Sequence, residues 1–309
     1  MPELAIIVVN YNTRELLRSC LTDVKQHLAT LDATITVVDN ASSDGSVEMT
    51  RREFPDVSLI AGKENLGFAR ANNRALEATD SDFVLLLNTD AFLCDGALQE
   101  LRRVMDSDGK IAVVGPRMFD RSGTLLASAH RFESLTKLAA TAFGIHELLP
   151  RCLVRSATYL CGRAGKLHRL NCDATAPVEV DWISGACMML RRSAIADVGP
   201  MDERYFMYME DEDWCRRFKR AGYRVMYAPA AQAIHHVASS STSSWRTAAA
   251  YRDSRRIYHR QYNRRFFWLF SALSEIYAAR RCASSEWAHL LRLPAGFGTS
   301  VPVPGEIDP

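Results

Sequence analysis

Residues Phe83 to Phe92 read Phe-Val-Leu-Leu-Leu-Asn-Thr-Asp-Ala-Phe, an apolar run followed by polar residues. An uninterrupted apolar run of this length is typical of a strand buried on both faces, as in the middle of a parallel sheet. Ligands of open α/β sheets bind beyond the carboxyl ends of such strands, so Asn88 and Asp90 are predicted to face a ligand. One residue lies between the two, so their side chains can point the same way, which suits a hard cation that holds a diphosphate. The pattern fits equally well a strand that simply ends in a polar turn.

The overall composition is that of an ordinary globular protein. The chain has 309 residues, which fits one α/β domain with an extension as well as it fits two domains. Its formal net charge of +2 gives no reason to expect a nucleic-acid partner. Met1-Pro2-Glu3 lacks the basic region of a signal peptide, and no apolar run reaches the length that spans a bilayer. We therefore expect a cytoplasmic protein.

Strand and helix patterns alternate through the first third of the chain. Leu4 to Val9 is an apolar run that ends at Asn10-Tyr11-Asn12, where a first ligand-binding loop is expected. Thr13 is predicted to cap a helix that continues to about residue 31. A second strand, Thr34 to Val38, delivers Asp39 to the same edge of the sheet. The same rhythm predicts helices near residues 46–54, 67–78 and 96–105 and strands at 57–61 and 111–115.

This alternation predicts a Rossmann-like α/β fold, with a mostly parallel central sheet, right-handed crossovers and helices on both faces. The sequence has no Gly-x-Gly-x-x-Gly in its first turn and no Gly-x-x-x-x-Gly-Lys-Ser/Thr anywhere. A dinucleotide oxidoreductase and a P-loop nucleotidase are therefore disfavoured. Residues 120–177 follow no clear pattern, and the sequence assigns them no role.

Four consecutive carboxylates open a predicted helix that ends in basic residues. They are Glu210, Asp211, Glu212 and Asp213. Acids at the amino end complement the helix dipole, but that structural interpretation needs only one or two of them. Adjacent carboxylates repel one another, so at least one is expected to bind a ligand or to act as a general base whose pKa its neighbours raise. Trp214 and Phe218 are predicted to form the buried face of this helix.

Two other features can carry chemistry. Gly185 interrupts the extended segment Val178 to Leu190, which marks either a close approach of the backbone to a ligand or an ordinary bulge. His235 and His236 follow an extended segment at 225–234. Neutral imidazole is a good ligand for divalent metals, although a polar residue at a strand end is the more frequent case.

With these motifs in order, the chain resembles inverting GT-A glycosyltransferases of family 2, and within that family the bacterial rhamnosyltransferase-like branch. The similarity runs from about Leu4 to Ser240. It implies a GT-A catalytic domain at residues 1–240. Residues 241–309 would then form a basic, aromatic helical extension with a flexible tail.

The resemblance implies that several loops build a nucleotide-sugar site in which Asp39 hydrogen-bonds the pyrimidine base. Asn88-Thr89-Asp90 stands at the place of the family's Asp-x-Asp motif, whose last acid binds the metal. Asn88 departs from that motif, and since an amide is a weaker metal ligand than a carboxylate, Mg²⁺ or Mn²⁺ is expected mainly on Asp90. His235, rather than His236, matches the family's further metal ligand. The implied donor-binding residues are Asn10, Tyr11, Asn12, Asp39, Asn65, Gly67, Asn73, Asn88 and Asp90.

The family's catalytic base belongs to a Glu-Asp pair before a tryptophan, which here is Glu210-Asp211. Asp211 is expected to take the proton from an acceptor hydroxyl that attacks with inversion, and Asp213 is its strongest rival. The expected acceptor-site residues are Trp182, Gly185, Glu210 and Asp213.

Branch similarity implies dTDP-rhamnose as donor and a lipid-linked or growing polysaccharide as acceptor, in cell-surface glycan synthesis. The alternatives are the same fold using UDP-GlcNAc, UDP-glucose or UDP-galactofuranose, and a non-catalytic sugar-nucleotide binding protein. The joint presence of Asp39, Asp90, Asp211 and His235 argues against a non-catalytic protein. The oligomeric state is left open.

The segment from Trp245 to Arg281 holds nine arginines against Asp253 and Glu275, with aromatic residues interleaved. Basic, aromatic and helix-compatible sequence suits the anionic inner face of the plasma membrane, where a lipid-linked acceptor would lie. The alternative is that these helices pack on the catalytic domain with arginines on a solvated face. Nucleic-acid binding has no matching motif.

Overall fold

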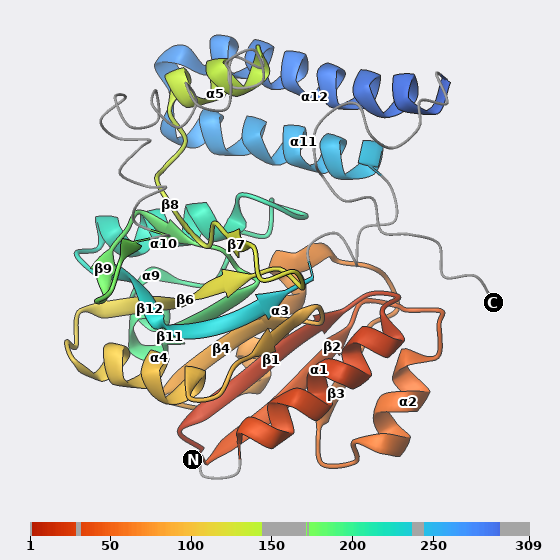
Figure 1. The fold of residues 1–309 in the computed structure, drawn as a ribbon, viewed down its shortest axis with the longest axis vertical. Helices are drawn as coiled ribbons and strands as arrows, with labels where there is room; N and C mark the ends of the chain where they lie inside the picture. Colours follow the sequence, from red (N-terminus) through yellow and green to blue (C-terminus); the bar gives the residue numbers. More distant parts are fainter. Residues whose placement is uncertain (1, 29–31, 144–170, 172, 237–243, 291–309) are drawn as a thin grey trace.

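The computed structural model describes residues 2–28, 32–143, 171, 173–236 and 244–290. Within these ranges one mixed sheet dominates the fold (Figure 1). Across the sheet, its strands are β3 (Ser58–Ala61), β2 (Ala33–Asp39), β1 (Leu4–Asn10), β4 (Phe83–Asn88), β11 (Cys187–Arg191), β6 (Ile111–Phe119), β12 (Arg224–His235) and β5 (Ala91–Leu93), with β7 (Leu125–Leu126) beside β6 and β9 (Val178–Glu179) beside β12. A smaller sheet pairs β8 (Ala129–His130) with β10 (Trp182–Ile183).

The longer strands of the main sheet run the same way. β1 pairs in parallel with β2 and β4, β2 with β3, and β12 with β6. β11 lies antiparallel between β4 and β6, so β6 and β12 keep the direction of β4. The expectation of a mostly parallel sheet is confirmed, and the antiparallel strand in its centre is a feature that the pattern of Val178 to Leu190 did not reveal.

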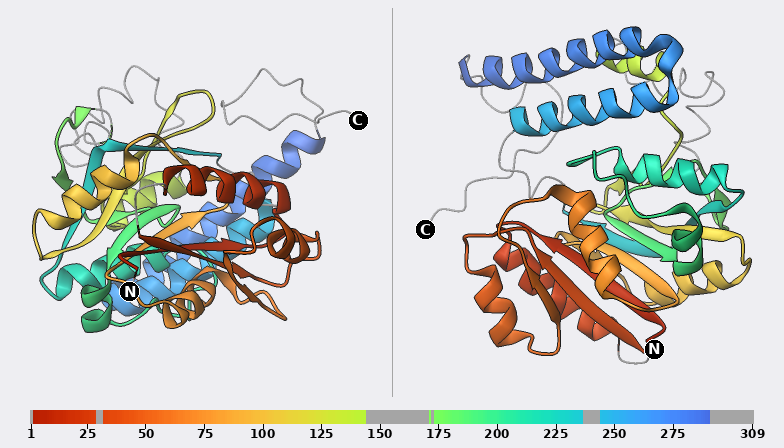
Figure 2. Two further views of the ribbon diagram at one scale, coloured as in Figure 1. Left: turned by 90° about the horizontal axis from the view of Figure 1, so that it is seen from below. Right: turned by 180° about the vertical axis from the view of Figure 1, so that it is seen from behind.

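The apolar run at β4 lies in the middle of the sheet between β1 and β11, as predicted. Its side chains alternate between two cores because successive residues of a strand point to opposite faces. Leu85 and Leu87 join one core, and Val84 and Leu86 join the other. Helices α1 (Arg14–His27), α2 (Ser46–Glu53) and α4 (Ala97–Asp106) cover the first core; α3 (Gly67–Ala78), α9 (Arg192–Val198) and α10 (Glu210–Arg220) cover the second (Figure 2).

The predicted helix starts and ends needed small corrections. α1 ends at His27 rather than near residue 31. Thr13 precedes α1 but does not cap it, because its hydroxyl donates to Oδ1 of Asn10 at 2.7 Å. The first helical N–H, that of Arg14, is instead satisfied by Oδ2 of Asp44 at 2.7 Å. A loop 30 residues away therefore caps this helix, which the local sequence does not indicate.

The C-terminal extension forms a helical layer above α10 in Figure 1. It comprises α11 (Ser244–Tyr262), the short 3₁₀ helix η1 (Arg264–Phe266) and α12 (Phe267–Leu290), with α5 (Leu135–Ala142) packed on α12. Tyr258 of α11 is fully buried against Tyr205 and Met209, which precede α10. The expectation that these helices pack on the catalytic part therefore holds for α11. No helix in the described ranges is long and apolar enough to cross a membrane.

A buried ionic cluster holds α11 in place. Glu133 is 9% exposed and contacts Nη2 of Arg255 at 2.6 Å and Nε2 of His259 at 2.7 Å. Nδ1 of His259 lies 2.9 Å from the side-chain amide of Asn263, which donates to it when the ring is neutral and protonated on Nε2. Burial lowers the pKa of His259, so the neutral ring is favoured and the cluster keeps one positive and one negative charge.

We expect Glu133→Ala to lower the free energy of unfolding by about 3–5 kcal/mol, because it leaves the Arg255 charge buried without its partner. Glu275 is the matched control, since it also faces two arginines of α11 but at 3.8 and 3.6 Å and on the surface. Glu275→Ala should change stability by less than about 1 kcal/mol. Urea unfolding of both variants measures the difference, and equal losses would show that the buried cluster does not hold the layer.

Candidate active site

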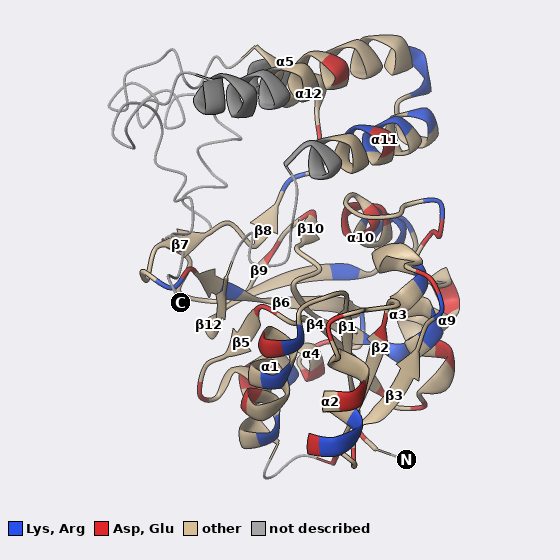
Figure 3. Cartoon of the chain, turned by 90° about the vertical axis from the view of Figure 1, so that its right-hand side faces the viewer, with Lys and Arg blue, Asp and Glu red and all other residues tan. Residues whose placement is uncertain are grey.

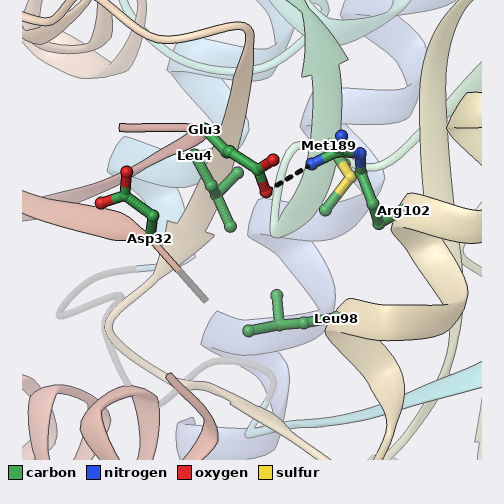
Figure 4. A pocket seen from close by; sticks show the side chains of 6 residues that line it. All are labelled: Glu3, Leu4, Asp32, Leu98, Arg102 and Met189. Atoms are coloured by element: carbon green, nitrogen blue, oxygen red, sulfur yellow. Dashed lines mark hydrogen bonds and ion pairs between the residues drawn. The ribbon is translucent and has the colours of Figure 1, made fainter. Parts of the chain in front are cut away.

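The predicted ligand-binding residues gather at the carboxyl edge of the sheet. Asn10, Asp39 and Asn88 are the last residues of β1, β2 and β4, and His235 ends β12, which runs in the same direction. A hollow at the opposite, amino-terminal edge lies beside Leu4, the first residue of β1, and an ion pair of 3.3 Å between Glu3 and Arg102 crosses it (Figure 4). The carboxyl edge is thus the place where the candidate residues converge.

Asn10 and Asp39 organise the first loop. Asn10 is fully buried, and its amide donates to Oδ2 of Asp39 at 2.7 Å and to the hydroxyl of Ser42 at 3.0 Å. Oδ1 of Asp39 accepts the backbone N–H of Ser42 at 2.8 Å. Tyr11 projects from this loop with 46% of its surface exposed, and Asn12 adopts a positive φ of 53°. Asn10 therefore fixes the carboxylate of Asp39, while Tyr11 remains free to stack on a ligand.

The segment at Asn65 to Gly67 packs tightly against the loop that leads to α10. Asn65 accepts the N–H of Gly67 at 2.9 Å, and the N–H of Phe68 donates to the carbonyl of Phe206 at 2.7 Å. Gly67 has φ +80°, and a Cβ there would lie 2.2 Å from the carbonyl oxygen of Phe206. Only glycine fits this position, so the predicted donor segment and the base-bearing segment are held in direct contact.

Asp90 and His235 lie next to each other. The register of β12 and β5 pairs His235 with Ala91, and Nε2 of His235 lies 3.2 Å from Oδ1 of Asp90. Asp90 is 2% exposed, and no hydrogen-bond donor within the described residues reaches its Oδ1. A buried carboxylate oxygen without a donor, beside an imidazole nitrogen, fits a divalent cation, with the nitrogen favouring Mn²⁺ over the more oxygen-selective Mg²⁺.

His236 has different surroundings. Its backbone N–H donates to the carbonyl of Asp90 at 2.8 Å, and its ring packs on Phe92 with centroids 4.7 Å apart. Burial is the main cause that lowers the pKa of His236. Of the two adjacent histidines, His235 is therefore the one whose ring meets the carboxylate of Asp90.

Asp211 is held by backbone N–H groups at the start of α10. Its Oδ2 accepts the N–H of Gly185 at 3.0 Å, and its Oδ1 accepts the N–H of Glu212 at 2.9 Å. The carbonyl of Ala186, the residue after Gly185, accepts the N–H of Asn88 on β4 at 2.9 Å. Gly185 and Ala186 thus connect the candidate base to the strand that carries the candidate metal residues. Ala186 was not singled out in the sequence, because its contribution comes from its backbone.

The four consecutive carboxylates differ sharply in exposure. Glu210, Glu212 and Asp213 are buried at 5%, 2% and 0%, whereas Asp211 alone of the four stays partly exposed. Burial raises the pKa of Asp211, and the two backbone N–H groups oppose that rise. Burial, and then the charge of Asp211, raises the pKa of Glu210 well above its ordinary value. The expected cause was repulsion by neighbouring acids, but burial is the larger cause at both residues.

The backbone before α10 is strained. Tyr208 and Met209 have positive φ angles of 71° and 68°, a left-handed conformation that costs a residue with a side chain about 1–2 kcal/mol. Met209 is buried against Tyr205 and Tyr258, which holds the strained turn in place. Strain of this kind concentrates where a side chain must be aimed, and here the turn directs Glu210 and Asp211.

Comparisons with known proteins decide the family. The model of Glycosyl transferase family 2 matches residues 5–199. This chain is a member of glycosyltransferase family 2. A curated relative is the N-acetylglucosaminyl-diphospho-decaprenol L-rhamnosyltransferase of Mycobacterium tuberculosis, 31% identical over 67% of each chain. The low-salt glycan biosynthesis hexosyltransferase Agl10 of Haloferax volcanii is 26% identical over 82% of this chain and 74% of its own. Rhamnosyltransferase WbbL of Escherichia coli is 47% identical, but over 18% of this chain and 22% of its own.

Solved structures agree with a GT-A fold for this glycosyltransferase. A mannosyltransferase from Pyrobaculum calidifontis, solved with GDP-Man and Mn²⁺, superposes with a TM-score of 0.56 at 16% identity and covers 94% of this chain and 79% of its own. GalNAc-T7, solved with UDP, GalNAc and Mn²⁺, gives the same TM-score of 0.56 at 12% identity over 83% of this chain and 47% of its own. At these identities the similarity concerns the fold.

Three predicted site residues of the glycosyltransferase have structural partners. Asn73 is 2% exposed and exchanges two hydrogen bonds with the backbone of Met201, so it contributes to the fold, and its donor-binding role stays a prediction. Asp213 is fully buried and contacts Nε of Arg217 at 2.8 Å and the hydroxyl of Tyr262 at 2.6 Å, and its acceptor-site role also stays a prediction. Trp182 stacks on His130 and stays half-buried, so its acceptor role remains a prediction.

We expect Gly67→Ala to be far more damaging than Gly96→Ala. Both glycines have positive φ, 80° and 76°, but a Cβ at Gly96 meets nothing within 4 Å. Gly96→Ala should therefore cost only the conformational strain of about 1–2 kcal/mol. Gly67→Ala should cost more and also weaken nucleotide binding, because Phe206 must move. Unfolding and binding of uridine or deoxythymidine diphosphate measure both effects, and equal losses in the two variants would contradict the tight contact.

Proposed function

We propose that this glycosyltransferase moves L-rhamnose from dTDP-rhamnose, with inversion, to a hydroxyl of a lipid-linked or growing polysaccharide acceptor. The observation that carries the proposal is a set of linked contacts. His235 lies beside Asp90, and the backbone of Gly185 and Ala186 links the partly exposed Asp211 to β4, the strand that leads to Asp90. A cation site and a candidate base held on one rigid edge suit transfer from a sugar diphosphate. The mycobacterial relative, named as an L-rhamnosyltransferase acting on N-acetylglucosaminyl-diphospho-decaprenol, supports the choice of donor and acceptor.

Recognition of the nucleotide would fall to the first loop. Asp39 has both carboxylate oxygens oriented by Asn10 and Ser42, and each keeps a lone pair for the N–H of a pyrimidine base. The exposed ring of Tyr11 would stack on that base. The Asn88 amide, half-buried at the end of β4, would bind a ribose hydroxyl.

Asp90 and His235 would hold Mn²⁺ or Mg²⁺ against the diphosphate. When bound, such an ion neutralises the negative charge that develops on the departing nucleoside diphosphate. The relatives solved with Mn²⁺ support the choice of ion. Among the described residues, this site offers one carboxylate and one imidazole, so phosphate oxygens and water would supply further ligands.

Asp211 would remove the proton from the attacking acceptor hydroxyl. Its two backbone hydrogen bonds fix the carboxylate, and its raised pKa makes it a stronger base than an exposed aspartate. Glu210, more deeply buried and with its pKa raised further, would be the protonated member of the pair, so that a single negative charge faces the acceptor. Attack from the face opposite the diphosphate inverts the anomeric carbon.

The metal assignment predicts that binding of dTDP or UDP depends on Mn²⁺ or Mg²⁺ through Asp90 and His235. Asp90→Ala should abolish the metal dependence, and His235→Ala should weaken it by at least about tenfold. His236→Ala is the matched control and should keep the dependence. Calorimetry with and without chelator measures it; unchanged metal dependence in Asp90→Ala, or a larger loss in His236→Ala, would refute the assignment.

The base assignment predicts that Asp211→Asn retains donor affinity while transfer falls by about a hundredfold or more. In the parent enzyme, transfer should decline as the pH falls through the raised pKa of Asp211, since the protonated carboxyl cannot accept a proton. Asp213→Asn is the control and should lower stability more than turnover, because it breaks the buried contact with Arg217.

One assay tests donor and base together. It measures nucleoside diphosphate released from dTDP-rhamnose and from UDP-linked GlcNAc, glucose and galactofuranose, with an N-acetylglucosaminyl-diphospho-polyprenol as acceptor. Normal turnover of folded Asp211→Asn would remove Asp211 from the mechanism. Preference for a UDP-linked sugar would overturn the rhamnose assignment alone.

A further inference from the structure

The outer face of α12 carries exposed apolar side chains, which together with Phe266 of η1 we name the α12 surface. Its residues are Phe266, Trp268, Leu269 and Ile276, exposed by 51%, 79%, 47% and 37%. Trp268 and Ile276 are eight residues apart with exposed Ala272 midway, so they lie on one side of the helix. The opposite side of α12 is the packed one, where Phe270 and Leu273 contact Leu138 of α5.

Arginines that have no carboxylate partner among the described residues border the α12 surface at its amino end. Arg260, Arg264 and Arg265 are exposed, and within the described residues no carboxylate lies within ion-pair distance of them. Figure 3 shows the blue of arginine at the turn between α11 and α12, beside the mostly tan first part of α12. Glu275 of α12 faces Arg252 and Arg256 at 3.8 and 3.6 Å. The exposed end is therefore both positively charged and apolar.

We propose that the α12 surface binds anionic phospholipid, with Trp268 and its apolar neighbours inserted among the headgroups and the arginines on lipid phosphates. Tryptophan is favoured at the boundary between headgroups and acyl chains, and exposed arginines near such a surface add electrostatic attraction. A second protein would have to match three positive charges beside an apolar surface. An anionic bilayer offers negative phosphates and an apolar interior over a continuous plane. The proposed contact is made by side chains of the α12 surface at the level of the headgroups.

The proposal goes beyond sugar transfer and does not depend on it, because lipid binding is measured without any sugar donor. The probe is a sedimentation assay of the full chain with vesicles of phosphatidylcholine containing about 30% phosphatidylglycerol, and with phosphatidylcholine alone. The parent protein should sediment with the anionic vesicles, and binding should fall as salt is raised, because salt screens exposed charges.

Two variants dissect the α12 surface. Arg264→Glu with Arg265→Glu should weaken binding to anionic vesicles by roughly tenfold or more, and Trp268→Ala should weaken it by several-fold. The matched control is Arg51→Glu with Arg52→Glu on α2, which makes the same charge change on exposed arginines at the far end of the molecule in Figure 1. Circular dichroism and unfolding confirm that each variant is folded.

Loss of binding in the α12 variants, with the α2 control unchanged, supports the proposal. It is overturned if the α2 and α12 charge variants lose binding equally, or if folded parent protein does not sediment with anionic vesicles. Sedimentation equilibrium without lipid tests the other occupant: a dimer that Trp268→Ala dissociates would mean that the α12 surface meets a second copy of the chain. Donor hydrolysis by the same samples reports separately on the glycosyltransferase site.

Discussion

The backbone of Gly185 and Ala186 is the constraint on which the geometry of the site depends. One peptide N–H holds the carboxylate of Asp211, and the neighbouring carbonyl holds β4 at Asn88. Because both contacts are made by main-chain groups of consecutive residues, the candidate base cannot shift independently of the strand that leads to Asp90. Gly185 also sits against Phe68, where a Cβ would approach the ring to 3.3 Å. The absence of a side chain brings three segments of the chain together.

The helical layer at the C-terminus supports the same region from the other side. Glu133 uses its backbone N–H to bind Glu212, one residue after Asp211, at 2.7 Å, while its carboxylate binds Arg255 and His259 of α11. Tyr262 of α11 donates to Asp213. The start of α10 is thus fixed between the sheet and α11. These contacts tie α10 to the C-terminal extension, so the two parts are physically interdependent.

The four neighbouring acids of α10 look equivalent in the sequence, but they differ in burial and in the partners of their carboxylates. Asp213 is neutralised by Arg217, and Glu212 accepts from the backbone of Glu133. Glu210 is buried, and no donor in the described part of the chain reaches its Oε2, which favours its protonated form. Asp211 combines partial exposure with two N–H donors, and is the member of the group suited to receive a proton from outside the protein. The left-handed residues Tyr208 and Met209 directly precede these four acids, which form the first turn of α10.

The strands that carry the first half of the site, and the edge at which the site lies, follow from the sequence. Alternating apolar runs and turn residues define β1, β2 and β4, and the ends of parallel strands must meet, so Asn10, Asp39 and Asp90 were predictable from local pattern. Tertiary structure alone decided which side chains remain available to a ligand. Asn73 and Asp213 carry the right chemistry, but Met201 and Arg217, with Tyr262, occupy their polar atoms. Likewise, only the register of β12 against β5 brings His235 to Asp90. Such pairings join residues far apart in the chain, and no local periodicity encodes them.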